Sequence, residues 1–194
     1  MQNALFFVLR TLFELYVLTF ALRLLLQWVA VDKRNPVVQF LFRVTNPVVL
    51  PLRRLLPAIG PIDTATAVAL LGLQLLGAAL LVRLACVGDP AIWEILSLAV
   101  LSIVNLGLSI CTWALIIYVV LSWVSPGGYN PGAALVSGLV EPLLAPFRRL
   151  IPPIGGLDLS PVFTLIAIQA LKLLLPLDRV LSSMLCTSLA GSIV

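Results

Sequence analysis

Histidine is absent from the sequence, and charged residues are scarce. Lysine, arginine, aspartate and glutamate make up 10% of the 194 residues, whereas hydrophobic residues make up 61%. A soluble domain carries about 25% charged residues, because its surface must face water. So few charges exclude an ordinary soluble domain and indicate that the chain folds against lipid. The basic excess is small, 12 residues against 8, and lies mostly between apolar runs, which argues against a nucleic-acid-binding protein.

Cysteine is also rare, and the three that occur, Cys86, Cys111 and Cys186, lack the spacing of metal ligands. Without histidine or a C-x-x-C pair, zinc or redox chemistry has little basis. No nucleophile lies beside a base, and no two carboxylates have a spacing suited to acid–base chemistry. We therefore expect no catalytic residue, no metal and no cofactor, and predict that the protein is not an enzyme. The N-terminus lacks a Lys/Arg-rich start, so the first helix is expected to be retained.

Four apolar stretches approach the roughly 20 residues that a membrane-spanning helix needs. They cover residues 4–31, 65–86, 92–124 and 161–185, approximately. In the first, Arg10 and Glu14 lie four residues apart and can pair on one helix face, while Arg23 is expected to extend toward the membrane interface. In the fourth, Lys172 and Pro176 leave two alternatives, an end near the proline or a kink and continuation toward Leu185.

The chain contains an internal repeat with a shift of 95 residues. The motif begins at Trp28 and Trp123, continues through Asn35-Pro36 and Asn130-Pro131, and extends to Gln74 and Gln169 without a gap. Chance agreement of these rare residue types at one offset is very improbable. We predict two units, residues 1–90 (the first repeat) and 91–194 (the second repeat). Each unit would cross the membrane twice, so both must have the same orientation.

Each repeat carries a basic, proline-rich segment between its two spans, at residues 35–61 and 130–156. Because the prolines are closely spaced, we predict broken helical turns in the membrane interface rather than continuous helix. Seven of the 12 lysines and arginines lie between Val31 and Pro61 or between Ser125 and Asp158. The positive-inside rule then places both segments in the cytoplasm and both termini on the opposite, periplasmic side.

The candidate docking residues are an arginine pair and an aspartate in each segment. They are Arg53, Arg54 and Asp63 in the first repeat and Arg148, Arg149 and Asp158 in the second. The arginines can anchor the topology, dock a partner or lipid headgroup, or take part in conduction. The aspartates precede helices and are expected to cap them, with a salt bridge to the arginines of the same repeat as an addition.

A second set of polar residues lies inside the predicted spans. It comprises Arg10, Glu14, Gln74, Asn105, Ser109 and Gln169. Asn105 and Ser109 are the equivalents of Arg10 and Glu14 at the shift of 95, so both repeats place polar groups on the same helix face. Hydrogen bonds between helices explain such groups, and a polar path for ions or a small solute is the alternative.

The doubled motif resembles the YggT family of bacterial integral membrane proteins, whose relatives include the YlmG proteins. It has the form W-x₆-N-P … P-x₃-P-x-R-R-x₂-P-x-I-G-x₂-D, and the likeness covers about residues 4–176. Two copies are typical of the proteobacterial form. The first copy departs from the second at Pro61, Thr64 and Ala65, where the second has Gly156, Leu159 and Ser160.

The resemblance implies a multi-pass protein of the bacterial inner membrane. It links the chain to cell division or nucleoid organisation, to osmotic stress and ion uptake, and in plastids to cytochrome b6 haem attachment, but supplies no catalytic residue. We predict an all-α, non-enzymatic scaffold or assembly factor that docks a partner or organises lipid. The rival hypothesis is a small oligomeric ion channel or transporter subunit. The expected partners are the bilayer with its anionic lipids, a further copy of the chain, and a membrane or cytoplasmic protein of unknown identity.

Overall fold

The computed structural model describes residues 2–29, 31–32, 34–57, 63–85, 91–124, 131–150, 158–177 and 180. These residues form helices and their connections, with no strand among them, so the all-α prediction is confirmed for the described chain. The helices are α1 (Gln2–Trp28), α2 (Pro36–Leu55), α3 (Thr64–Ala85), α4 (Ile92–Val124), α5 (Pro131–Leu150) and α6 (Ser160–Leu174).

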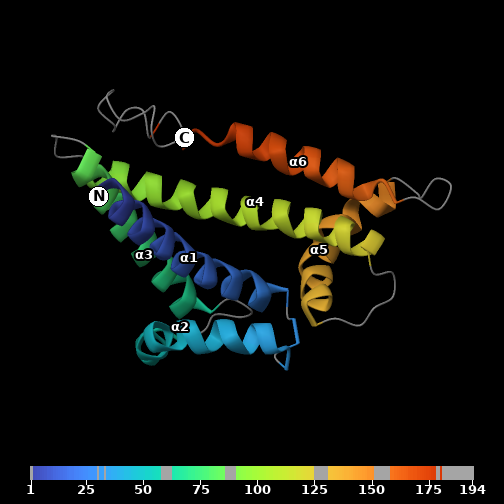
Figure 1. Cartoon of the computed structure of the whole chain (residues 1–194), viewed down its shortest axis with the longest axis horizontal. Coiled ribbons are helices and arrows are strands. Elements are labelled where there is room, and N and C mark those ends of the chain that lie inside the picture. Colours follow the sequence, from blue (N-terminus) through green and yellow to red (C-terminus); the bar gives the residue numbers. More distant parts are fainter. Residues whose placement is uncertain are drawn as a thin grey trace.

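The helix bounds recur at the spacing found in the sequence. Pro36 and Leu55 bound α2, and Pro131 and Leu150, each 95 residues later, bound α5. In Figure 1, α1 and α3 run together toward α2, while α4 and α6 run together toward α5. Each proline-containing helix therefore lies across one end of a pair of other helices. Both of these ends are on the same side of the molecule.

The prediction of broken helical turns in the proline-rich segments was wrong. Both α2 and α5 are continuous helices of 20 residues that run through their internal prolines. Pro47, Pro51, Pro142 and Pro146 are all exposed, on the face away from the buried stripe. Each proline removes one backbone donor and crowds one preceding carbonyl. Because the two prolines are four residues apart on one outer face, the helix can bend there while its buried face stays packed.

The start of α2 joins the two repeats. The Asn35 side chain accepts a hydrogen bond from the backbone N–H of Val37 (2.9 Å) and donates one through Nδ2 to the carbonyl oxygen of Pro131 (2.6 Å). A cavity of about 380 Å³ lies beside this contact, between the first turns of α2 and α5. Leu135 of α5 packs against Leu26 and Leu41 of the first repeat at the same place. The ends that carry α2 and α5 are therefore in direct contact.

The fourth predicted span is shorter than expected, since α6 ends at Leu174. Leu175 has extended backbone angles (φ −72°, ψ 123°), which is the conformation that a following proline imposes on the residue before it. The helix is thus interrupted at Leu175 and Pro176, and helical geometry resumes at Leu177, where the Val180 N–H donates to the Pro176 carbonyl oxygen (3.1 Å). Residues 178–179 and 181–185 of the predicted span lie outside the described residues.

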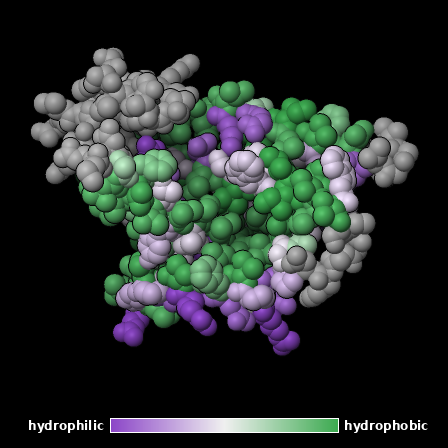
Figure 2. All heavy atoms as spheres, in the orientation of Figure 1, coloured by the Kyte–Doolittle hydropathy of each residue, from purple (hydrophilic) through white to green (hydrophobic). Residues whose placement is uncertain are grey.

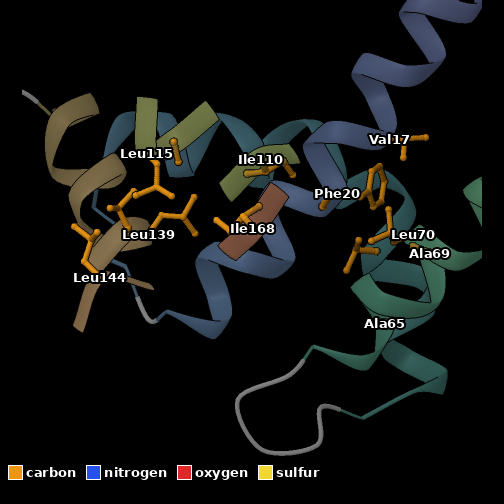
Figure 3. Close-up of a cluster of buried hydrophobic side chains, with 14 residues drawn as sticks. Val17, Phe20, Ala65, Ala69, Leu70, Ile110, Leu115, Leu139, Leu144 and Ile168 are labelled. Atoms are coloured by element: carbon orange, nitrogen blue, oxygen red, sulfur yellow. The ribbon is translucent and has the colours of Figure 1, made fainter. Parts of the chain in front are cut away.

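The main core is formed by both repeats. Figure 3 shows Val17 and Phe20 of α1 grouped with Ala65, Ala69 and Leu70 of α3, beside a second group from α4, α5 and α6. The second group contains Ile110, Leu115, Leu139, Leu144 and Ile168. Helix α4 packs against α1 and α3 as well as against α5 and α6. It therefore connects the two halves of the core.

One described helix, α4, is long and apolar enough to cross a membrane. The most apolar part of α4 is only 22% buried within the molecule, whereas a helix in the core of a soluble protein is mostly buried. Shorter apolar stretches occur at Thr64–Leu80 and Ser160–Leu174, and α1 carries Arg10, Glu14 and Arg23. The structure thus supports membrane character through α4, while a fold with four spans stays a prediction.

Candidate docking site on the proline-containing helices

In the first repeat, Asp63 is the centre of a buried polar cluster. Its carboxylate oxygen Oδ2 forms an ion pair with Arg53 and accepts hydrogen bonds from Thr66 Oγ1 (2.8 Å) and Gln27 Nε2 (3.4 Å). The side chain of Asp63 is 5% exposed. Asp63 immediately precedes α3, so this cluster fixes the end of α2 against the start of α3 and against α1. The predicted salt bridge between Asp63 and the arginine pair is confirmed for Arg53.

Arg23 of α1 lies behind this carboxylate, and the prediction that it extends to the interface was wrong. Its side chain is 1% exposed, and Nη2 is 3.7 Å from Asp63 Oδ2. Nη1 donates to Thr45 Oγ1 (2.5 Å) and Asn46 Oδ1 (3.0 Å), while the guanidinium lies 4.5 Å from the centre of the Phe42 ring. The carboxylate, the two oxygens and the aromatic face offset part of the cost of removing this arginine from water.

The second repeat forms the equivalent arrangement around Arg148. Arg148 Nε donates to Asp158 Oδ2 (2.9 Å), Nη1 donates to both oxygens of Glu141 (2.8 and 3.0 Å), and Nη2 donates to Tyr118 Oη (3.1 Å). Asp158 Oδ1 accepts the backbone N–H of Ser160 (2.9 Å) and so caps the first turn of α6. The predicted pairing is confirmed here too. We call the pairs Arg53–Asp63 and Arg148–Asp158 the Arg–Asp clamps.

The two Arg–Asp clamps correspond residue by residue at the shift of 95. Arg53 and Asp63 match Arg148 and Asp158, whereas Arg23 is replaced by Tyr118 and Asn46 by Glu141. A cation on the long helix is therefore exchanged for a phenol, and an amide on the proline-containing helix for a carboxylate. As a result, the first cluster holds two cations and one anion, and the second holds one cation and two anions.

Both aspartates are held in their ionised form. Burial raises the pKa of Asp63, but hydrogen bonds from Arg53 and Thr66 outweigh this effect, so the pKa lies below its ordinary value of 3.8. For Asp158, partial burial is likewise outweighed by hydrogen bonds from Ser160 and Arg148, and the pKa is again lowered. Burial lowers the pKa of Arg148, but Asp158, Tyr118 and Glu141 raise it above its ordinary value of 12.5. The clamps are thus ion pairs at neutral pH.

The two arginines of each pair have different surroundings. Arg53 and Arg148 are 44% and 34% exposed and pair with their aspartates, whereas Arg54 and Arg149 are exposed without such a pairing. Within the residues that the structure describes, the side chains of Arg54 and Arg149 make no hydrogen bond or ion pair. Successive residues on a helix are about 100° apart, so one arginine can reach the aspartate while the next points away from it. The two arginines of a pair cannot be distinguished in the sequence. In the structure the first of them pairs with an aspartate and the second does not.

The second predicted set is not brought together as one site. Arg10 Nε pairs with Glu14 Oε1 (2.7 Å), which confirms that pairing. Ser109 Oγ accepts a hydrogen bond from Lys172 Nζ (2.9 Å). Gln74 and Asn105 are half-buried and Gln169 is exposed. None of the three side chains forms a hydrogen bond within the described chain. A continuous polar path inside a single molecule is therefore not formed by these residues.

Four residues that take part in these contacts were not among the site residues predicted from the sequence: Arg23, Tyr118, Glu141 and Lys172. A signal for the first was present, since Arg23 and Gln27 are four residues apart and share a helix face. Tyr118 and Glu141 could have been found by applying the shift of 95 to Arg23 and Asn46. Nothing in the sequence indicated that Lys172 meets Ser109, because 63 residues separate them.

Fold and site together define an all-helical protein of two tandem units, each with a proline-containing helix held by an Arg–Asp clamp. The chain belongs to the CCB3/YggT family, whose profile matches residues 2–84 and again residues 97–178. The resemblance seen in the sequence is thus confirmed.

Relatives cover most of the chain. A protein of Pseudomonas aeruginosa is 43% identical over 175 residues, which is 90% of this chain and 89% of that protein. The YggT protein of Escherichia coli K12 is 38% identical over 172 residues, 89% of each chain. The chloroplastic YlmG homolog protein 2 of Arabidopsis thaliana is 39% identical over 66 residues, 32% of this chain and 25% of that protein. No solved structure matches.

Proposed function

We propose that the chain is an inner-membrane scaffold with four spans, α1, α3, α4 and α6, and that α2 and α5 lie at the cytoplasmic surface. Large apolar side chains exposed along the long helices support this topology, among them Leu12 (59%), Trp113 (64%) and Ile166 (61%). Such an extended apolar surface suits lipid rather than water. Figure 2 shows hydrophobic residues over much of one face, with one hydrophilic group along the edge where α2 lies and a second group over α6 at the opposite edge.

The orientation follows from the distribution of exposed positive charge. Arg43, Arg54 and Arg149 are exposed on α2 and α5, and the positive-inside rule assigns the side with such residues to the cytoplasm. The termini then lie on the periplasmic side. Both repeats have the same orientation in this arrangement, as two units with two spans each require.

One observation carries the proposed activity. Arg54 and Arg149 occupy equivalent positions at the ends of the two proline-containing helices and are exposed, while their neighbours Arg53 and Arg148 are held in the clamps. The next residues, Leu55 and Leu150, are 79% and 77% exposed. A free arginine beside an exposed leucine suits an anionic lipid headgroup with its acyl chain, or an acidic and apolar protein segment. The scaffold would dock its partner or gather anionic lipid at these two places.

Substitution of the free arginines tests this proposal. With a photo-crosslinking residue at position 55 or 150, the double variant Arg54→Gln/Arg149→Gln should lose its crosslinked partner in native membranes, while membrane insertion is retained. The matched variant Arg54→Lys/Arg149→Lys keeps the charge and should retain most of the crosslinking if attraction to an anion dominates.

The same variants separate lipid from protein as the partner. Native mass spectrometry of the purified protein should show bound anionic lipid that the Gln variant loses, if lipid is the partner. A crosslinked polypeptide that the Gln variant loses indicates a protein. Crosslinking and lipid binding that are both unchanged in the Gln variant would reject the docking proposal.

The alternative of an ion channel or transporter subunit has one supporting observation. The Arg10–Glu14 ion pair is exposed on α1, with 37% and 60% of the side chains accessible. A path that uses this pair would require neighbouring chains to enclose it. Purified protein in liposomes should then give a cation flux that is lost in Glu14→Gln, and an equal flux in liposomes without protein would remove this alternative.

A further inference from the structure

The outward ion pair on α1 is unusual for a helix that crosses a membrane. Arg10 and Glu14 pair at 2.7 Å, and 37% and 60% of their side chains are exposed. Glu14 lies 14 residues before Trp28, the last residue of α1, and therefore about 21 Å from that end of the helix. In the proposed topology this position is deep within a hydrocarbon layer about 30 Å thick. Charged groups at such a depth face protein or water rather than acyl chains, so protein or water must cover this face of α1.

A cation without a carboxylate partner lies on a different helix. Lys172 of α6 is half-buried and donates a hydrogen bond from Nζ to Ser109 Oγ (2.9 Å). No carboxylate pairs with it within the described residues. Its neighbours Leu171 and Leu173 are 52% and 87% exposed, so this part of α6 forms an outer surface. A lysine there gains from an anion supplied by another molecule.

Glu14 and Lys172 lie at the same depth. Ser109, which contacts Lys172 directly, is the equivalent of Glu14 at the shift of 95. Lys172 also lies 12 residues after Ser160, the first residue of α6, or about 18 Å from the end near the Arg–Asp clamps. The two charges are therefore within a few ångströms of one level, as measured from the same side of the molecule.

The two charges cannot meet within one chain as it is folded here. Helix α4 packs against both α1 and α6 and lies between them (Figure 1). The carboxylate of Glu14 is thus on one side of the molecule and the ammonium of Lys172 is on another, at about the same depth. Identical chains inserted in the same orientation can bring these two sides together, in a head-to-tail contact that a ring can close.

We propose that the chain assembles head to tail in the membrane, with Glu14 of one molecule paired to Lys172 of the next. Exposed leucines next to the charges, among them Leu15, Leu171 and Leu173, pack around this pair. The carboxylate then bridges Arg10 of its own chain and Lys172 of its neighbour, away from lipid. This interface rests on the proposed four-span topology, but it uses none of the residues of the docking proposal.

Cysteine crosslinking between two differently tagged populations tests the contact. With the three native cysteines replaced by alanine, one population carries Leu15→Cys and the other Leu173→Cys. Oxidation in native membranes should give a mixed dimer when both are present and no dimer when either is present alone. Leu5→Cys, which is 63% exposed on the same helix but about 15 Å away along it, is the matched control and should not crosslink to position 173.

Charge reversal tests the ion pair itself. Glu14→Lys and Lys172→Glu should each reduce the yield of the mixed dimer at least tenfold, and the double reversal in one chain should restore it. Dimers from Leu15→Cys alone would indicate a symmetric contact and overturn the head-to-tail arrangement. No mixed dimer with the native charges, or no rescue by the double reversal, would also overturn the pairing. Loss of partner capture in the Arg54 and Arg149 variants bears on docking alone, so the two proposals can fail separately.

Discussion

The two repeats build the same Arg–Asp clamp in different surroundings. In the first, Asp63 is 5% exposed and faces a second cation, Arg23, that is 1% exposed. In the second, Arg148 and Asp158 are 34% and 37% exposed, and Tyr118 replaces the second cation. Geometry is therefore retained while charge and burial differ. The energetic role of each clamp should differ accordingly, because an ion pair contributes according to its desolvation.

The largest expected difference comes from removing the two aspartates. Asp63→Asn leaves Arg23 buried without a full counter-charge, and should lower the free energy of unfolding by about 3–5 kcal/mol. Asp158→Asn breaks an exposed pair and should cost about 0–1 kcal/mol. Denaturant unfolding of both variants in the same detergent measures the difference. Equal losses would show that burial does not distinguish the clamps.

Small residues on α3 give a second, smaller contrast. A Cβ atom added at Gly77 would lie 2.8 Å from Phe13 Cε1, whereas one added at Gly72 meets nothing within 4 Å. Gly77→Ala should therefore destabilise the protein by about 1–3 kcal/mol through overpacking. Gly72→Ala should be neutral or stabilising by up to about 1 kcal/mol through helix propensity.

Thermal unfolding of the two alanine variants of α3 provides the measurement. Position 77 is the equivalent of Lys172 at the shift of 95, so the same place in the two repeats holds a close helix contact in one and a charge in the other. A Gly77→Ala variant as stable as Gly72→Ala would mean that Phe13 moves aside freely.

Acid should produce the smallest effect and act through both clamps. The pKa of each aspartate is lowered from its ordinary value of 3.8. In acid the unfolded chain binds protons before the folded one does, so the clamps stabilise the protein fully above about pH 4 and lose this contribution as the pH falls through the folded pKa values. Unfolding measured between pH 6 and pH 3 should show this decline.

Comparison with the asparagine variants identifies the source of the acid effect. The decline in stability below pH 4 should be weaker in Asp63→Asn than in Asp158→Asn, because the buried Asp63 makes the larger contribution. An unchanged decline in both variants would place the responsible groups elsewhere.

The sequence indicated more about the helices than about their contacts. The shift of 95 residues predicted matching helix bounds, and α4 lies at Ile92–Val124, as its apolar run predicted. The pairing of Asp63 and Asp158 with their arginines was also predicted. The proline spacing, however, pointed to broken turns where the structure has continuous helices. A local pattern cannot show that the prolines occupy an exposed face on which a bend is tolerated.

What the sequence alone determined is a chain whose scarcity of charge favours lipid over water, with one unit repeated at a shift of 95 residues and helices placed by apolar runs. Composition and spacing are local properties, so they can be read without coordinates. Only the tertiary structure decided that Arg23 turns inward, that Arg53 and Arg54 have separate roles, and that Lys172 meets Ser109. These contacts are formed by residues that are separated in the chain, so they depend on how whole helices pack against one another.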